Sequence, residues 1–395
     1  MVLGWLKPKY NPIAVDIGTD SIKMLQLEPQ ADQMRLIDAA VAEIPESARA
    51  SLQARDEFAA EAIRSMLHQG AFKGRQIVTC LPAANMAVQH LRVAKMSDEE
   101  LRKALPFEAQ GKLPFDANRA VLRHLIVGEV YQDQDAKTEV ILMAASRDSV
   151  ERHLNLLAKC KLEVVGIHVE PSALIECFAH LFRRKGDENI STMFVDMGAG
   201  STHVVIAHGT HMVFAKHLSV GGDVFNKKVA DTIKGSSTAA RELRIKIIAQ
   251  AQSQRLPAGV VAINNGNDGH PLGAAPSNGH ASTLVDAETL AKIVTALEEP
   301  IDTLVSELEL CVRYYESIHT GKQIDRVIFV GGESRHVSLC QKIAQRIGLP
   351  ATLGDPMARL LKDSHCHSKV EMRVPQPGWA IAVGLGLGVK GEQIS

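Results

Sequence analysis

The sequence lacks several features that would assign it to a common functional class. Its 395 residues carry a formal net charge of −1, so it lacks the basic excess that nucleic-acid binding requires. Its six cysteines are scattered and form no C-x-x-C pair, which indicates reduced thiols in a cytosolic setting. The start of the chain is too short and has no apolar core region to be a secretory signal. The most apolar stretch, residues 377–389, is shorter than the roughly 20 residues that span a bilayer.

The chain contains two similar segments in which an aspartate and glycines interrupt an apolar strand. The first is AVDIGTDSIKMLQL, residues 14–27, and the second is VDMGAGSTHVV, residues 195–205. Glycine lets the backbone N–H groups of such a turn approach a bound anion closely. The aspartate repels a phosphate but can face it through Mg²⁺. For either segment alone, an ordinary glycine hairpin with a solvated aspartate is the better interpretation, but the pair predicts two related halves that face one ligand.

These patterns define a set of candidate ligand contacts. A third glycine element follows the apolar strand of residues 327–330 and precedes an amphipathic helix, where a ligand can lie on the backbone. Lys23 adds a compact positive charge that suits a phosphate, the alternative being a solvated surface lysine. The candidates are Asp16, Gly18, Thr19, Ser21 and Lys23 in the first segment, Asp196, Gly198, Gly200, Ser201 and Thr202 in the second, and Gly331, Gly332, Ser334 and Arg335 in the third, with Asp16 and Asp196 expected to hold Mg²⁺ or its water.

The order of the three elements resembles the actin-like ATPase superfamily, which includes actin, DnaK-type chaperones, sugar kinases and FtsA. In this resemblance, residues 16–23 and 196–203 are the two phosphate loops and residues 327–336 are the adenosine loop. Within the superfamily, the chain is similar to the PilM family of type IV pilus and secretion assembly proteins. The segments that carry this similarity are LRKALPFEAQGKLPFDANRAVLRHLIV (101–127), VILMAASRDSVERHLNLLAKCKLEVVGIHVE (140–170) and HLSVGGDVFNKKVA (217–230).

The resemblance implies ATP or ADP with Mg²⁺ as the ligand, and it adds four candidate residues. Glu170 and His203 would lie beside the attacking water. The alternatives are a carboxylate at a helix start, favoured by the helix dipole, and a partly buried histidine. Gly221 and Gly222 would lie near the γ-phosphate at the hinge between the lobes, unless they form an ordinary turn.

Four positions depart from the family pattern. The family has a Glu-x-x-Lys pair on the ribose and base, and the aligned positions here are Arg241 and Arg244. Asp20 lies in the first phosphate loop, where a carboxylate could repel phosphate unless it turns outward. Glu333 stands where a small residue is usual. Together these departures predict slow or absent ATP hydrolysis without affecting the fold.

The fold implied by the resemblance is α/β, of the actin-like (ribonuclease H-like) two-lobed ATPase type, with an inserted α/β subdomain as in FtsA and PilM. Helical spacing predicts a helix over residues 290–315, in which Pro300 should form a kink or begin a second helix. The expected division is residues 11–85, 166–190 and 358–392 for the first core half, 86–165 for the inserted partner-binding subdomain with the order β-α-β-β-α, 191–222 and 323–357 for the second core half, and 223–322 for a helical subdomain with a mobile loop at 257–283.

The function implied by the resemblance is an ATP-binding scaffold at the cytoplasmic face of the inner membrane, in a type IV pilus or type II secretion platform. Residues 86–165 would bind the N-terminal tail of a PilN-like membrane protein, and a homo-oligomer or filament is a further expectation. Phe107 and Phe115 lie beside prolines and could meet that tail, or could fill the small core. The alternatives are an FtsA-like polymerising cell-division protein and a small-molecule kinase of the same superfamily, for which we find no substrate-binding pattern.

Overall fold

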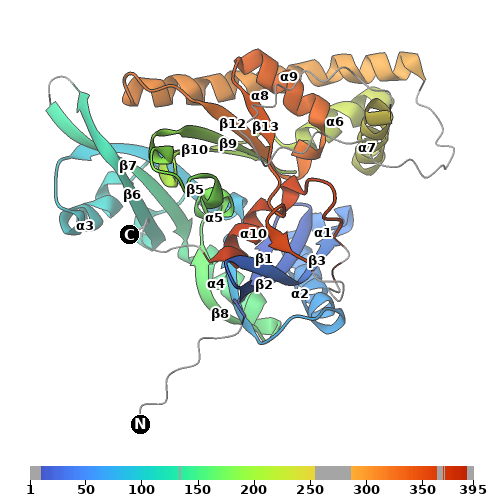
Figure 1. Cartoon of the computed structure of the whole chain (residues 1–395), viewed down its shortest axis with the longest axis horizontal. Coiled ribbons are helices and arrows are strands. Elements are labelled where there is room, and N and C mark those ends of the chain that lie inside the picture. Colours follow the sequence, from blue (N-terminus) through green and yellow to red (C-terminus); the bar gives the residue numbers. More distant parts are fainter. Residues whose placement is uncertain (1–9, 133–134, 254–285, 363–367, 369, 389–395) are drawn as a thin grey trace, which may run out of the picture.

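The computed structural model describes residues 10–132, 135–253, 286–362, 368 and 370–388. Figure 1 shows two lobes, one above the other, with a smaller unit on one side of them. The loop expected at 257–283 lies outside the described residues. The architecture of the described residues is the actin-like α/β fold that the family resemblance implied.

The first lobe is built on a six-stranded sheet. Its strands are β1 (Ile13–Ile17), β2 (Ser21–Gln30), β3 (Gln33–Glu43), β4 (Gln76–Cys80), β8 (Glu163–His168) and β14 (Leu360–Leu361). They lie in the order β14-β3-β2-β1-β4-β8. The apolar strand β1 is buried along its whole length, as a central strand covered on both faces should be. It runs antiparallel to β2 and parallel to β4, and β2 runs antiparallel to β3.

The second lobe repeats this pairing pattern. Its strands are β9 (Ser191–Met197), β10 (Thr202–His208), β11 (His211–Leu218), β12 (Arg326–Val330) and β13 (Ala351–Leu353), in the order β11-β10-β9-β12-β13. β9, β10 and β11 are antiparallel neighbours, whereas β12 runs parallel to β9 and to β13. The same succession of antiparallel and parallel pairs occurs in β3-β2-β1-β4-β8, which confirms two related lobes.

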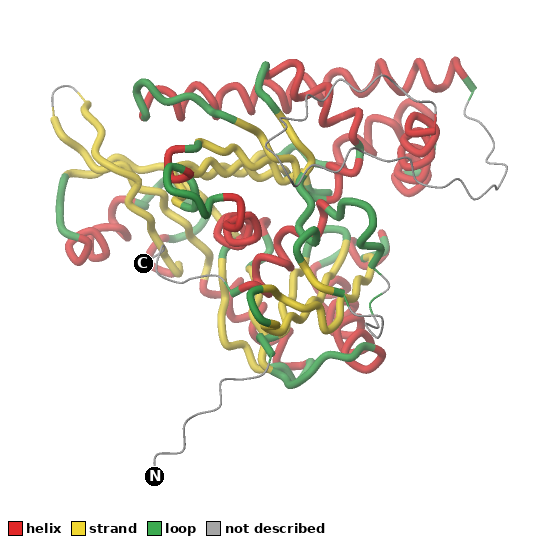
Figure 2. The backbone as a smooth tube through the Cα atoms, viewed as in Figure 1, coloured by secondary structure: helices red, strands yellow, loops and turns green. Residues whose placement is uncertain are grey.

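Helices cover the outer face of each sheet. They are α1 (Glu46–Arg49), α2 (Leu52–Gln69) and α4 (Arg147–Lys159) on the first lobe, and α6 (Gly222–Ile233), α8 (Ala287–Ile318) and α9 (Val337–Ile347) on the second. α7 (Ser237–Ser253) packs against α6 and α8. Figure 2 shows α8 and α9 above the second sheet, where Leu304, Leu308 and Ile343 are fully buried. A kink or a second helix was expected at Pro300; α8 is continuous through this residue, so no second helix begins there. The apolar stripe after Pro300 packs on the sheet and holds the helix together there.

Two helices lie between the lobes. They are α5 (Glu170–Phe178) and α10 (Ala380–Leu387), and α10 is the apolar connecting helix expected near the end of the chain. A Cβ atom at Gly384 would overlap the carbonyl of Ala173, so the two helices approach closely because this position is glycine. This contact places the start of α5 beside the cleft between the lobes.

The smaller unit is an antiparallel sheet of three strands with one helix. Its elements are β5 (Met86–Ala94), α3 (Asp98–Glu108), β6 (Ala120–Gln132) and β7 (Asp135–Ser146), with the strand order β5-β7-β6. Ser97 caps α3 and forms a capping box with Glu100, for which a serine followed three residues later by a glutamate is the sequence signature. α4 follows β7 but belongs to another core, because Leu156 and Leu157 pack with the first sheet and α2.

A buried carboxylate joins the smaller unit to the second lobe. Glu139 on β7 is 0% exposed. It accepts hydrogen bonds from His90 Nδ1 at 3.0 Å, Arg92 Nε at 3.2 Å and the hydroxyl of Tyr314 at 2.7 Å. Tyr314 belongs to α8, so Glu139 fixes the smaller unit against the longest helix of the second lobe.

Candidate functional site

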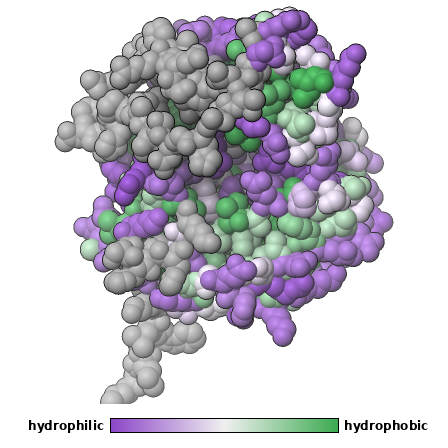
Figure 3. Space-filling model, turned by 90° about the vertical axis from the view of Figure 1, so that its right-hand side faces the viewer, coloured by the Kyte–Doolittle hydropathy of each residue, from purple (hydrophilic) through white to green (hydrophobic). Residues whose placement is uncertain are grey.

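The two glycine hairpins face each other across a cavity of about 550 Å³ between the lobes. Figure 3 shows the surface hollowed between the lobes, with hydrophilic side chains on both sides. Sequence candidates from both lobes line the cavity. They are Asp16, Gly18, Thr19, Ser21, Lys23, Glu170, Asp196, Gly198, Gly200, Ser201, His203, Arg241, Arg244, Gly331, Gly332 and Arg335.

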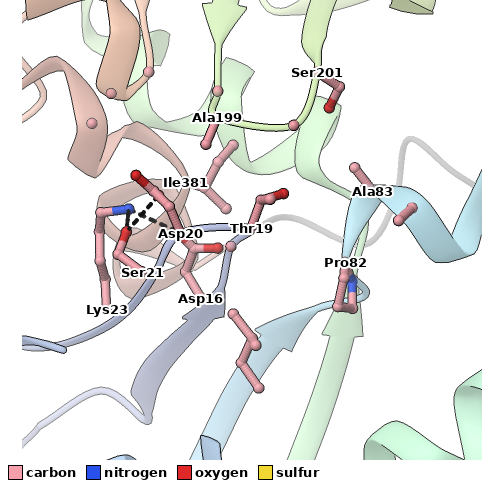
Figure 4. A pocket seen from close by; sticks show the side chains of 18 of the residues that line it. Asp16, Thr19, Asp20, Ser21, Lys23, Pro82, Ala83, Ala199, Ser201 and Ile381 are labelled. Atoms are coloured by element: carbon pink, nitrogen blue, oxygen red, sulfur yellow. Dashed lines mark hydrogen bonds and ion pairs between the residues drawn. The ribbon is translucent and has the colours of Figure 1, made fainter. Parts of the chain in front are cut away.

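The two hairpin turns have the same internal geometry. The N–H of Gly18 donates to the carbonyl of Ser21 at 3.0 Å, and the N–H of Gly198 donates to that of Ser201 at 2.9 Å. Figure 4 shows Thr19 of the first turn opposite Ala199 and Ser201 of the second. A Cβ atom at Gly200 would lie 2.9 Å from Oγ1 of Thr19, which is too close for a real side chain. The small residues therefore let the turns approach each other across the cavity.

The strand register places a basic residue opposite each aspartate. Asp16 on β1 pairs with Lys23 on β2, and Asp196 on β9 pairs with His203 on β10. Lys23 Nζ lies 3.8 Å from the Asp16 carboxylate and donates to Ser21 Oγ at 3.0 Å. Each lobe thus brings one acid and one base to the cavity in equivalent positions.

The two aspartates share an unusual electrostatic environment. Burial is the main cause that raises the pKa of Asp16 to about 6, and the nearby charges of Glu170 and Asp196 add to it. Burial likewise raises the pKa of Asp196 to about 6, with Glu170 again contributing. Among the described residues, no three His, Cys, Asp or Glu side chains converge to hold a metal ion by themselves. The negative charges of the acids therefore exceed the positive charges around them. Such a site suits a cation that takes further ligands from water or from a bound anion.

Glu170 and His203 form an ion pair at the edge of this site. His203 Nδ1 lies 2.7 Å from the Glu170 carboxylate, and each side chain is 14% exposed. Burial works to lower the pKa of His203, but the charges of Glu170 and Asp196 and the hydrogen bond outweigh it and raise the pKa to about 9. The imidazole is therefore protonated at neutral pH. Its Nε2 lies 3.3 Å from Ser201 Oγ, so His203 faces the second turn as a donor.

The residues that depart from the family pattern contact one another. Arg241 donates to Asp20 at 3.0 Å across the cleft. Arg244 is only 6% exposed and forms an ion pair with Glu333. It also donates to Asn226 at 2.6 Å. Both arginines line the cavity, and their guanidinium groups are already engaged by protein carboxylates.

Four sequence candidates do not line the cavity and instead support its walls. The hydroxyl of Thr202 donates to the carbonyl of Val220 at 2.7 Å, and Ser334 donates to the carbonyl of Val330. The N–H of Gly222 donates to the carbonyl of Gly198 at 3.0 Å. A Cβ atom at Gly221 would overlap the backbone of the second turn. The contacts of Thr202, Gly221 and Gly222 hold the second hairpin in place, and that of Ser334 closes the turn after β12.

One wall of the cavity contains none of the sequence candidates. This wall includes Arg55 and Asp56 of α2, Asn85 and Arg152. Arg55 donates to the carbonyl of Gly18 at 2.5 Å and so braces the first turn. Leu52, Arg55, Asp56 and Ala59 share one helix face by their spacing, which was the only available signal.

A family model described as type IV pilus assembly protein PilM matches residues 14–249. The chain belongs to this family. Among solved structures, a PilM–PilN type IV pilus biogenesis complex is similar at a TM-score of 0.72 and 19% identity, covering 97% of this chain and 100% of that one. The ethanolamine utilization protein EutJ from Carboxydothermus hydrogenoformans is similar at a TM-score of 0.51 and 12% identity, covering 97% and 90%. At these identities the likenesses show the fold alone.

The surface of the smaller unit in this PilM-family chain carries one prominent apolar side chain. Phe107 on α3 is 76% exposed, whereas Leu105 two residues earlier is 3% exposed. α3 runs through Pro106, so Phe107 lies on the helix rather than at a break. Phe115 is half-buried, and neither phenylalanine belongs to the small core. No helix among the described residues has the length and apolar character needed to cross a membrane.

Proposed function

We propose that this PilM-family chain binds ATP or ADP together with Mg²⁺ in the cavity between its lobes. The observation that carries the proposal is the meeting of two aspartates, buried Asp16 and partly buried Asp196, one from each lobe, on equivalent glycine turns. Such turns present N–H groups to phosphates, and Gly331 and Gly332 supply a further bare backbone segment for the nucleoside.

The chemistry of the aspartates supports the metal. Mg²⁺ bound between Asp16, Asp196 and phosphate oxygens would offset their charges, as it does in other phosphate sites. Without a cation, burial makes ionisation of both carboxylates costly, which the raised pKa values express. Two protein carboxylates with water and phosphate form an ordinary ligand set for this ion.

Glu170 and His203 are the candidates for a hydrolytic step. Glu170 can accept a proton from, or orient, a water molecule at the end of the cavity. His203 is held protonated by Glu170 and is therefore a donor rather than a base. The same ion pair engages the carboxylate of Glu170, so a water molecule must compete with His203 for it. We propose that hydrolysis is slow or absent.

The partner surface is the unit formed by β5, α3, β6 and β7. We propose that it binds the N-terminal tail of a PilN-like membrane protein, and that this contact places the chain at the cytoplasmic face of the inner membrane. The similar complex contains PilM with PilN. The exposed Phe107 and the half-buried Phe115 offer apolar contacts for an extended peptide. A nucleotide-binding scaffold in a type IV pilus or type II secretion platform combines both sites.

Competition binding with a fluorescent ATP analogue tests the nucleotide site. Asp16→Ala and Asp196→Ala should each weaken binding at least about tenfold in the presence of Mg²⁺, the size of effect that loss of a charged ligand has. Asp231→Ala, at an exposed acid of α6, is the matched control and should bind like the wild type. Equal binding by all four proteins would overturn the proposal.

A further inference from the structure

Polar contacts join the outer parts of the two lobes beside the cavity. Each pairs a residue of the first turn or α1 with a residue of α6 or α7. They are Asp20 with Arg241 at 3.0 Å, Arg49 with Asp223 at 3.4 Å, and Glu46 with Thr238 at 2.7 Å. Asp20 and Arg241 line the cavity, and the other four residues lie outside its lining. The contacts thus extend from the cavity wall outward, and we call them the clasp.

The first-lobe side of the clasp is tied together. The N–H of Ile44 donates to the carbonyl of Asp20 at 2.8 Å. Nε of Arg49 then donates to the carbonyl of Ile44 at 3.2 Å. The first phosphate turn and α1 are therefore linked through the end of β3, and they move as one piece.

The second-lobe side is tied together through Arg244 and Asp223. Arg244 on α7 binds Asn226 of α6 and Glu333 of the third glycine element. The N–H of Asp223 donates to the carbonyl of Ala199 in the second turn at 2.7 Å. The two helices and two of the glycine elements therefore form a second rigid piece.

We infer that the clasp controls the rate at which a nucleotide enters and leaves the cavity, an inference that rests on the proposed function. Because each side is internally braced, parting of the lobes breaks the contacts together rather than one at a time. Both sides also end in a phosphate turn, so the clasp and the ligand hold the same two loops. A nucleotide leaves only when the clasp has opened.

The clasp also gives a role to two departures from the family pattern. Asp20 alone would repel a phosphate, and Arg241 alone would place a positive charge where the family has a negatively charged carboxylate. As an ion pair they neutralise each other at the cavity wall and connect the lobes. A compensated pair leaves the site electrostatically suited to Mg²⁺-nucleotide.

Stopped-flow release of a fluorescent ADP analogue from the full chain tests the inference. Arg49→Ala and Asp223→Asn lie outside the cavity lining and should each speed release about threefold, the factor that corresponds to one partly exposed ion pair. The exchanged pair, Arg49→Asp with Asp223→Arg, should restore slow release only in part, because an aspartate at position 49 cannot replace the bond from Arg49 to the carbonyl of Ile44. Raising the salt from about 0.05 to about 0.5 M should speed release in the wild type and less in the single variants.

A matched control and a ligand-free readout make the test decisive. Lys228→Ala removes an ion pair between α6 and α8 within the second lobe and should leave release unchanged. Spin labels at the exposed positions Gln53 and Lys246 report the distance between the lobes. The distribution of this distance should be broader in Arg49→Ala than in the wild type.

Release at wild-type rates in both single variants, with unchanged distances, would overturn the clasp. If the wild type bound no Mg²⁺-ADP, the proposed function would fail instead. The label distances would then still decide whether the clasp holds the lobes together.

Discussion

Nδ1 of His203 lies 2.7 Å from the carboxylate of Glu170, and this contact joins β10 of the second lobe to the first residue of α5 between the lobes. The pair lines the cavity beside both aspartates. The ion pair therefore connects two elements of the fold and also presents charged groups to the cavity. Substitutions of Glu170 and His203 can show which of these two roles matters for each property of the protein.

Substitution of either member should affect turnover more than affinity. Glu170→Gln keeps the shape of the side chain but removes the proton acceptor, so any steady-state ATP hydrolysis should fall about tenfold or more, while the dissociation constant for ATP changes less than about threefold. Hydrolysis that persists in Glu170→Gln and His203→Gln would exclude both residues from that step.

The stability of the protein should depend on the charge of His203. Its pKa is raised from 6.5 to about 9, so the folded state binds the proton more tightly than the unfolded state. The stabilisation is fully present below pH 6.5 and is lost as the pH rises through 9, and it is on the order of 3 kcal/mol. Thermal unfolding of the wild type and of His203→Gln across pH 6 to about 9.5 checks this. Parallel curves would contradict it.

Removing one buried charge should stabilise the ligand-free chain. The pKa of Asp196 is raised to about 6, so its ionisation opposes folding above that pH. Asp196→Asn should raise the free energy of unfolding at pH 8 by on the order of 2 kcal/mol, and the gain should vanish below pH 4. Denaturant unfolding without nucleotide measures both values. A destabilised variant at pH 8 would mean that the carboxylate has a structural partner that outweighs its burial.

The hydrogen bonds of Glu139 that connect the smaller unit to α8 should contribute strongly to the stability of the protein. Burial works to raise the pKa of Glu139, but the bonds from His90, Tyr314 and Arg92 prevail and lower it. Glu139→Gln leaves Arg92 without its counter-charge and should cost about 3 kcal/mol, whereas Tyr314→Phe should cost about 1 kcal/mol. The cost of Glu139→Gln should shrink as the pH falls below the ordinary range of a glutamate, because the wild-type carboxylate is then protonated. Equal costs for the two variants would contradict this account of Glu139.

Substitutions of Phe107 and Leu105 should have different effects: the first should weaken binding of a tail peptide, and the second should lower stability. Phe107→Asp changes an exposed side chain and should leave the melting temperature unchanged while weakening capture of a PilN-like N-terminal peptide about tenfold. Leu105→Ala removes a buried side chain and should lower stability by about 2–4 kcal/mol. Point substitutions test this better than deletion of residues 86–165, because α4 belongs to the first-lobe core. Full capture by Phe107→Asp would place the tail elsewhere.

The sequence predicted what depends on local pattern. The hairpins around Asp16 and Asp196 combine apolar runs with glycines, and strand register then fixes Lys23 and His203 opposite them. The capping box at Ser97 is equally local. These features need only neighbouring residues, so one sequence is sufficient to find them.

The sequence could not predict pairings between distant segments. In the sequence, Asp20 and Arg241 are two separate departures from the family pattern. Only the folded structure shows that they form an ion pair with each other. Glu139 sits in a strand with no pattern that marks it as buried, because its partners come from β5 and α8. Pro300 predicted an interruption, but packing of α8 on the second sheet outweighs one lost hydrogen bond.

The central claim is that ATP binds together with Mg²⁺. Calorimetric titration of the wild-type chain with ATP tests it most directly, when it is done once with Mg²⁺ present and once with a chelator in place of Mg²⁺. The two facing aspartates predict binding that is at least about tenfold tighter with Mg²⁺ at pH 7.5, and an advantage that falls as the pH drops below the aspartate pKa values of about 6. Binding that is equally tight without Mg²⁺, or no binding under either condition, would contradict the account.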